Sequence, residues 1–464
     1  MLGLGVLLLG ACGSSGGENG TGGSGSGGAT GGMHGQLDGG TGGATGSGGE
    51  GGGTGATGGS AGGKGGGTGG LGGKGGGTGG GTGGSAGAFV PAAHPSLPVV
   101  LNLGGSVKAT PKVQLIAYAS DSGLTDIEAF LQELTKTTYW RETTSEYGVG
   151  PLTILPTIRL SSTPPATITD ADLQTKLLTN TSGANPPWGV ADSQTIFLFV
   201  FPPGTIESSD PTSKCCSAFD GYHSAMQTGT AIVPYAVGCA CPGYDGPNVT
   251  DIQERTVAIS HELVEATTDP LPGYDTAYGQ EDDNDIVWTA VSGGETADMC
   301  EFNDDSNVVP PGSKYMVQRT WSNAAAALIQ NPCVPHTTST IPYFNSYPAL
   351  TQIPYNGGTT LGVNIPIGQS KTIDVKLSSA AATPGAWNVT VYDYDQILVG
   401  ASSPYLGLSL DKATGRNGDT LRLTITPHTA DPTLGGEAFF IYSEYGTAGS
   451  ADFQSNVTMG LVTN

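Results

Sequence analysis

The sequence is poor in basic residues, with 17 Lys and Arg against 40 Asp and Glu among 464 residues and a formal net charge of −23. Binding to a phosphate backbone depends on clustered Lys and Arg, so a nucleic-acid partner is excluded. The chain also lacks any long apolar run after its first twelve residues, so no membrane-spanning helix is predicted beyond them. Histidine is scarce too, at six residues, which directs attention to the few that stand beside acids.

Residues 1–12 read MLGLGVLLLGAC and form an apolar segment that is too short to span a bilayer. Its position at the N-terminus predicts a signal peptide for export. The end of the segment, Leu-Gly-Ala-Cys, resembles the bacterial lipobox, which implies that Cys12 carries the lipid. We therefore expect a protein anchored to a bacterial membrane by lipid alone, with its globular part outside the cytoplasm. A plain secretory signal with a chance cysteine is the alternative.

Residues 13–87 are dominated by glycine, with Ser, Thr and Ala filling most other positions and no proline. Such a segment has almost no apolar surface to bury and cannot offset the entropy lost on ordering. The absence of proline also excludes a collagen-like helix. This composition predicts a disordered tether between the anchor and the rest of the chain.

Six cysteines remain beyond Cys12, an even number that favours three disulfides in an exported protein. Their clustering suggests that Cys215 and Cys216 pair with Cys239 and Cys241, and Cys300 with Cys333. A zinc site of four thiolates is the competing interpretation, although Cys-Cys and Cys-x-Cys are poor spacings for it.

The segment 88–336 is predicted to be an α/β or α+β domain. Apolar strands are expected at 111–119 and 195–201, and an amphipathic helix at 124–136 with Thr125 and Glu128 as a capping box. A second helix is expected to start near Thr250, with Gln253 completing its capping box, and to end at Asp269-Pro270.

Residues 340–464 have a different character, because short alternating runs rich in Thr and Val recur about every ten residues. That spacing predicts an all-β sandwich of the immunoglobulin-like kind. The pair Asp393 and Asp395 alternates along one run and is expected to face water.

The stretch SHELVEATTDP, 260–270, nearly spells the zinc-protease helix H-E-x-x-H, with Glu265 in place of the second histidine. His261 and Glu265 are four residues apart on a helix, so both side chains can reach one metal ion. Glu262 would then be the general base. An ordinary helix with surface acids is the alternative.

A third ligand must come from elsewhere in the chain. The spacing of Glu295 and Asp298 resembles the E-x-x-D of gluzincins, which makes Glu295 the ligand and Asp298 its supporting acid, or the reverse. His223 is another candidate for the third ligand, because histidines are scarce, and His223 and Asp269 are also candidates for support around the site. Zn²⁺ is the expected ion. One imidazole and two carboxylates would neutralise its charge and make it a weaker Lewis acid, so the harder ions Mn²⁺ and Ca²⁺ are alternatives.

Several blocks between 110 and 335 resemble the phosphate-induced, exordium-like family, in particular its bacterial members. These blocks are VQLIAYA, FDGYHS, AIVPYAVGCACPG, SHELVEATTDP, ETADMC and YMVQRTWSNAAAALIQNPC. The resemblance implies that His261, Glu262, Glu265, Asp269, Glu295 and Asp298 belong to one site, with Cys300, Trp321 and Cys333 matching as well. It also implies a bridge between Cys300 and Cys333.

Two functions follow as hypotheses. The first is a surface-tethered, metal-dependent peptidase that hydrolyses peptide bonds with activated water. The second is a non-enzymatic cell-surface protein that binds a glycan or a protein partner through the same disulfide-bearing domain.

Overall fold

The structure is a computed structural model that describes residues 89–209, 213–228, 231–244, 249–280, 284–399, 404–429 and 435–464. Val90–Asn464 lies within one compact unit. The predicted signal peptide, Cys12 and the predicted tether at 13–87 lie outside the described residues. No helix in the described ranges combines the length and the apolar character that crossing a bilayer requires.

The first part of the fold is built on a largely parallel sheet with the strand order β3-β2-β6-β9-β8, in which β4 also pairs with β2. All of these strands run parallel except β8, which is antiparallel to β9 at one edge. Their bounds are β2 Lys112–Tyr118, β3 Thr153–Ile154, β4 Ile158–Leu160, β6 Thr195–Val200, β8 Gly221–Thr228 and β9 Ala231–Gly238.

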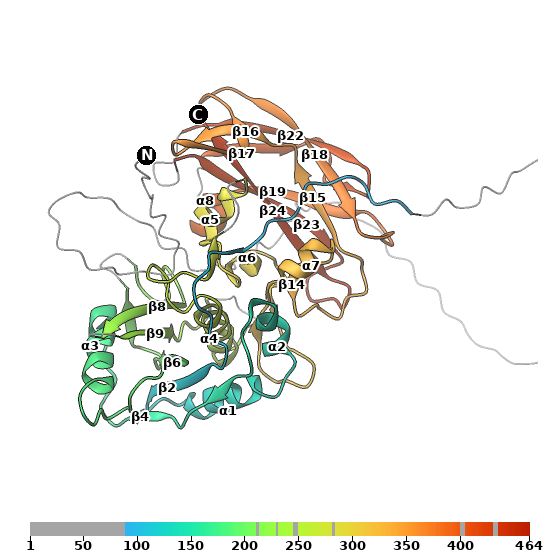
Figure 1. Ribbon diagram of the computed structural model, residues 1–464. Helices are drawn as coiled ribbons and strands as arrows, with labels where there is room; N and C mark the ends of the chain where they lie inside the picture. Colours follow the sequence, from blue (N-terminus) through green and yellow to red (C-terminus); the bar gives the residue numbers. More distant parts are fainter. Residues whose placement is uncertain are drawn as a thin grey trace, which may run out of the picture. The chain divides into compact units, whose positions relative to one another are not determined.

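Both faces of this sheet are covered by helices, which explains why its central strands are apolar without alternation. In β6, Ile196 and Leu198 join a core with α1 (Leu124–Leu134) and α4 (Asp251–Thr268). Phe197 and Phe199 point the other way, into a core with α3 (Asp170–Thr181). Figure 1 shows α3 on one side of these strands and α1 with α4 on the other. The strands expected at 111–119 and 195–201 are confirmed as β2 and β6.

The helix that carries the H-E motif begins as predicted. Thr250 caps α4 by accepting a hydrogen bond from the Gln253 backbone, and the Gln253 side chain accepts one from the Thr250 backbone. The capping box expected at Thr125 is wrong, because α1 begins at Leu124 and its N-cap is Gly123, two residues before Thr125. The Asp121 carboxylate accepts from the Gly123 backbone N–H instead, so a residue before the helix stabilises its start.

The remaining elements of this part are short. They are β1 Leu101–Asn102, α2 Tyr139–Thr144, the 3-10 turn η1 Ser145–Tyr147, β5 Thr167–Thr169, β7 Ile206–Ser208, β10 Tyr278–Gln280, α5 Ile286–Ser292, α6 Asp298–Glu301, β11 Asn307–Val308, β12 Val317–Gln318, β13 Thr320–Trp321, α7 Asn323–Ala327 and β14 Cys333–Val334.

The part after residue 340 is β-rich and contains two sheets, with the orders β15-β18-β22-β20 and β16-β17-β24-β23-β19-β21. Their side chains share one core, in which Val375 and Leu423 of the first sheet meet Val389 and Ile441 of the second. The bounds are β15 Phe344–Pro348, β16 Thr351–Tyr355, β17 Gly358–Asn364, β18 Lys371–Ser379, β19 Trp387–Asp393, α8 Tyr394–Val399, β20 Leu406–Leu410, β21 Thr414–Gly415, β22 Thr420–Pro427, β23 Glu437–Tyr445 and β24 Gln454–Thr463.

Asp393 does not face water as expected. It is 1% exposed, and its carboxylate accepts hydrogen bonds from the backbone N–H groups of Asp395 and Leu406. The carboxylate therefore holds the turn after β19, which the alternation in sequence could not reveal.

Three disulfides join the six cysteines of the described part: Cys215 with Cys239, Cys216 with Cys241, and Cys300 with Cys333. The first two tie the segment before β8 to the end of β9. The third ties α6 to β14. This grouping is the one that the clustering of the cysteines suggests, and it leaves none of the six as a free thiolate for zinc.

Candidate metal site

The candidate site lies along α4, on the side that contacts β8, β12 and the turn before α6. The opposite side of the helix buries Ile259 and Leu263 in the core under the sheet. As a result α4 is enclosed almost all round, and the Glu265 side chain is 0% exposed while that of His261 is 12% exposed. The acids of this helix are therefore not solvated surface groups.

His261 is held in one orientation by Gln318 of β12. The Gln318 side-chain oxygen lies 3.0 Å from His261 Nδ1, and the Gln318 amide donates to the Ala297 carbonyl at 2.9 Å. Because that oxygen can only accept, Nδ1 carries a proton, and Nε2 is the ring nitrogen that faces the two carboxylates. Nε2 lies 3.1 Å from Glu265 Oε2 and 3.4 Å from Asp298 Oδ1.

Glu265 is fixed by the turn that leads into α6. Its Oε1 accepts hydrogen bonds from the backbone N–H groups of Ala297, at 2.9 Å, and Asp298, at 3.2 Å. The two consecutive amides occupy one carboxylate oxygen and leave Oε2 directed at the histidines. The side chain of Asp298 also accepts a hydrogen bond from the Glu295 backbone N–H, which further stabilises this turn.

His223 enters the same cluster from β8. Its Nε2 lies 3.2 Å from the Asp269 carbonyl oxygen, which can only accept, so Nε2 carries a proton. Its Nδ1 lies 3.5 Å from Glu262 Oε2 and 3.7 Å from Glu265 Oε2, yet it has no hydrogen-bond partner among the described residues. The side chain of His223 is 0% exposed.

The structure thus brings the residues predicted for the metal site into one cluster, in which five of them form two ligand sets. His261, Glu265 and Asp298 have ligand atoms that all lie within 4.8 Å of one another, and so do His223, Glu265 and Glu295. Asp298, the alternative choice for third ligand, is the acid that shares a set with His261. Asp269 supports the site through its backbone carbonyl to His223 and through its carboxylate, which accepts from the Ala277 backbone N–H.

The geometry of the first set can be compared with that of a tetrahedral ion. Ligand atoms at 2.0–2.1 Å from Zn²⁺ lie about 3.3 Å apart. The separations of 3.1 and 3.4 Å from His261 Nε2 to the two carboxylate oxygens match that value. One nitrogen and two oxygens are also a donor set that Zn²⁺ and Mn²⁺ accept. The residues present therefore fit a divalent ion.

The electrostatics of the cluster point the same way. Burial, with the charge of Glu265, raises the pKa of Asp298 to about 7, and burial with several neighbouring acids raises that of Glu295 well above its usual range. Burial alone would raise the pKa of Glu265, but the charge and hydrogen bond of His261, the charge of His223 and the Ala297 backbone N–H together outweigh it and lower the pKa to about 2. For His261, burial lowers the pKa, and the charges of Glu265 and Glu262 more than reverse this. Without a cation the cluster must therefore hold extra protons.

Gln318 is a site residue that the sequence analysis did not single out, although it stands within the quoted block YMVQRTWSNAAAALIQNPC.

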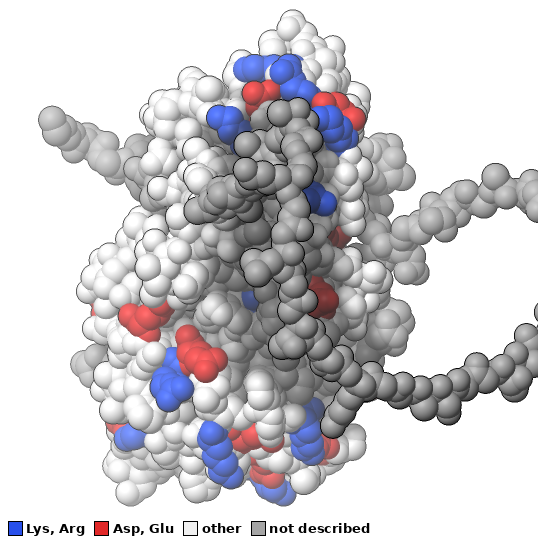
Figure 2. Space-filling model, turned by 90° about the vertical axis from the view of Figure 1, so that its right-hand side faces the viewer, with Lys and Arg blue, Asp and Glu red and all other residues white. Residues whose placement is uncertain are grey.

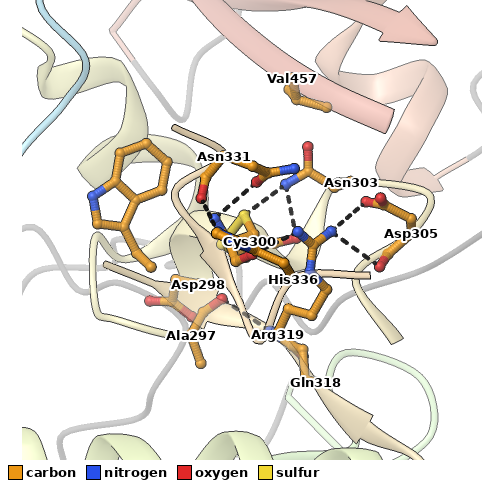
Figure 3. Close-up of a disulfide and its surroundings, with 12 residues drawn as sticks. Ala297, Asp298, Cys300, Asn303, Asp305, Gln318, Arg319, Asn331, His336 and Val457 are labelled. Carbon is orange, nitrogen blue, oxygen red and sulfur yellow. Dashed lines mark hydrogen bonds and ion pairs between the residues drawn. A yellow bond between two sulfur atoms is a disulfide. The ribbon is translucent and has the colours of Figure 1, made fainter. Parts of the chain in front are cut away.

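The next residue, Arg319, is buried and pairs with Asp305 at 2.8 Å. Figure 3 shows its guanidinium between Asp305 and the Cys300–Cys333 disulfide, and Arg319 also donates to the Cys333 carbonyl. Because α6 begins at Asp298, this arrangement secures the segment that carries the proposed third ligand.

On the face shown in Figure 2, Lys and Arg lie next to Asp and Glu at both ends of the molecule, and no patch of one sign stands out. The acids with the strongest mutual influence are buried in the cluster. The negative charge that matters for chemistry is therefore internal.

No family model matches the chain, and no curated protein matches it. Among solved structures it is similar to domains 4 and 5 of the S-layer protein SbsC, with 13% identity and a TM-score of 0.15, over 35% of this chain and 93% of that chain. A structure of SbsC domains 1–6 gives 12% identity and a TM-score of 0.15, over 35% and 26%. A β-glucosidase from Listeria innocua gives 11% and 0.16, over 79% and 48%. Likenesses this weak carry no argument about fold or function.

Proposed function

We propose that this chain is a metal-dependent hydrolase that cleaves peptide bonds, with its ion held by His261, Glu265 and Asp298. The observation that carries the proposal is that His261 Nε2 lies 3.1 and 3.4 Å from the Glu265 and Asp298 oxygens, separations that match those between two ligands of a tetrahedral ion. Gln318 fixes the histidine and two backbone amides fix Glu265, so the donors are held in place by their neighbours.

Zn²⁺ is the proposed ion, and when bound it would polarise a carbonyl and lower the pKa of a water molecule, less strongly than in a site with two histidines because the two carboxylates neutralise its charge. Glu262 is the proposed general base. Its Oε2 is buried and lies 3.5 Å from His223 Nδ1, with no closer polar partner in the described part, so it can take and return a proton. Gly221 makes room for it, since a Cβ there would lie 2.9 Å from Glu262 Oε1.

The wider setting of the proposal draws on the sequence. Membership of the exordium-like family is supported by the convergence of its matching positions, with His261, Glu262, Glu265, Glu295 and Asp298 in one cluster and Cys300 bonded to Cys333. We propose that the two sheets after residue 340 are an immunoglobulin-like sandwich acting as a spacer. We also propose export and lipidation at Cys12, which would hold the hydrolase at a membrane surface.

The decisive experiment is Glu262→Gln in the full-length protein, tested with a peptide library and by metal analysis. The variant should retain its metal, because Glu262 belongs to neither ligand set, and should lose hydrolysis by about 10²–10⁴-fold. Glu207→Gln is the matched control, since Glu207 is a buried glutamate in the core on the other face of the sheet. Unchanged hydrolysis in Glu262→Gln would contradict the mechanism.

A second candidate function is glycan binding without catalysis, and one observation favours it. A cavity of about 780 Å³ lies beside α5, β13, β15 and β24. Trp288, Trp321, Tyr343 and Tyr347 line it together with the amides of Asn345 and Asn456. Aromatic faces and amides are the groups that contact sugar rings and their hydroxyls. This candidate predicts that no peptide is cleaved and that His261→Asn leaves glycan binding intact, as measured on a glycan array.

A further inference from the structure

The two histidines of the cluster are arranged in the same way around one carboxylate oxygen. Each has one ring nitrogen that donates to a fixed acceptor, Gln318 Oε1 for His261 and the Asp269 carbonyl for His223. Each then turns its other nitrogen toward Glu265 Oε2, at 3.1 Å from His261 Nε2 and 3.7 Å from His223 Nδ1. Glu265 Oε2 therefore lies between one ring nitrogen of each histidine.

We propose that the cluster binds two divalent cations, with Glu265 Oε2 shared between a first ion on His261 and Asp298 and a second ion on His223 and Glu295. This inference rests on the proposed metal site at His261 and adds to it a second site. The two donor sets have only Glu265 in common.

Unsatisfied buried atoms support the second site independently of the first. His223 Nδ1 and Glu295 Oε2 are both buried and have no hydrogen-bond partner among the described residues. A buried polar atom without a partner costs about 1–3 kcal/mol, and two of them in one ligand set suggest that something else binds there. Glu262 Oε2, 3.5 Å from His223 Nδ1, is unsatisfied as well.

The charge balance also favours two ions. In the described part of the chain, Glu262, Glu295 and Asp298 form ion pairs with histidine and none with Lys or Arg. With Glu265 and the buried Asp269 they make five carboxylates in one enclosed space. A single divalent cation would offset less than half of their full charge, whereas two would offset most of it.

Sharing one oxygen limits how far apart the ions can be. With metal–oxygen bonds of up to about 2.2 Å, two ions on Glu265 Oε2 lie no more than about 4.4 Å apart, which includes the 3.5–4 Å of known two-metal sites. The other oxygen, Oε1, is occupied by two backbone amides, so a bridge through Oε2 is the one that the turn before α6 permits.

The test is a metal count on the full-length protein after chelation and reloading with Zn²⁺. Wild type should bind two equivalents, and His223→Gln and Glu295→Gln one each. His336→Gln replaces an exposed histidine outside the cluster and should still bind two. Near-ultraviolet circular dichroism confirms that each variant is folded.

A second measurement needs no substitution. Wild type loaded with Mn²⁺ should give the many-line electron paramagnetic resonance spectrum of two coupled ions, and not the six lines of an isolated ion. One equivalent in wild type, kept in His223→Gln and lost in His261→Asn, would overturn the second site and leave the proposed function standing. No metal in wild type would overturn both.

Discussion

Replacing Gln318 with Met tests whether the orientation of His261 matters for metal binding. The substitution keeps the volume of a buried side chain that is 6% exposed and removes two hydrogen bonds, one to His261 Nδ1 and one to the Ala297 carbonyl. The imidazole then loses the acceptor that fixes its tautomer. Without this hydrogen bond, the ring is free to rotate and Nε2 is no longer held toward Glu265 and Asp298.

The expected magnitude follows from that geometry. Losing a hydrogen bond that orients a metal-binding histidine typically weakens metal binding 10–100-fold, which is about 1.4–2.7 kcal/mol. The backbone of Gln318 still accepts from the Tyr139 hydroxyl and donates to Ser260 Oγ, so β12 should stay in register. The loss should therefore be seen in the dissociation constant of the metal.

The assay is a competition titration of Zn²⁺ against a chromophoric chelator, with urea unfolding of the metal-free protein alongside. Gln454→Met is the matched control, because Gln454 is also buried and its amide donates to the Ile341 carbonyl in the second part of the fold. Both variants should lose stability, and only Gln318→Met should lose affinity. Equal affinities in wild type and Gln318→Met would refute the role given to Gln318.

Three further predictions concern the stability of the first part of the fold and its link to the site. Burial raises the pKa of Glu207 to about 8, so between about pH 4.5 and 8 the folded protein keeps a proton that the unfolded chain releases. The free energy of unfolding should therefore be highest below about pH 4.5 and fall as the pH rises to 8, by about 5 kcal/mol at most. Urea midpoints between pH 5 and 9 should fall less steeply in Glu207→Gln than in wild type. The double substitution Cys300→Ser with Cys333→Ser opens a loop of 33 residues and should lower the free energy of unfolding by about 4 kcal/mol. It should also weaken metal binding, because Asp298 lies two residues from Cys300. An unchanged free energy of unfolding would contradict this prediction. Gly221→Ala would place a Cβ within 3.0 Å of Glu262, and Gly238→Ala would place one within 3.0 Å of Ile259. Both variants should lose about 1–3 kcal/mol of stability, measured by thermal unfolding. Only Gly221→Ala should lower kcat, because only its clash involves the proposed general base.

The part of the site that could be predicted from sequence is the part on α4. The capping box at Thr250 and the spacing of His261 and Glu265 are local patterns, and a helix converts them into geometry without reference to the rest of the chain. The boundary of α1 could not be predicted in this way. It depends on the Asp121 carboxylate, which accepts hydrogen bonds from the Arg255 guanidinium of α4 and from the Gly123 backbone N–H.

The contributions of His223 and Gln318 depend on contacts between distant segments. His223 reaches the cluster because β8 pairs antiparallel with β9 and places alternate side chains toward α4. Gln318 reaches it because β12 packs on the same helix. Sequence spacing carries no information about such pairings, so His223 was a candidate both for the third ligand and for support, and it could not be assigned to a separate ligand set.

The burial of the acids could not be read from the sequence either. The sequence pattern was equally consistent with Glu265 and Asp298 as ligands of a metal ion and with both as solvated acids on the surface. The structure encloses both, at 0% and 7% side-chain exposure, because the 293–301 turn closes over α4 and is tied down by the Cys300–Cys333 bond. Enclosure is what turns these acids from surface charges into candidate ligands.

The most direct test of the central claim is anomalous X-ray diffraction at the zinc edge from crystals of the full-length protein grown with Zn²⁺. The account predicts an anomalous peak within bonding distance of His261 Nε2, Glu265 Oε2 and Asp298 Oδ1. Ordered side chains of these three residues with no anomalous peak between them would contradict it.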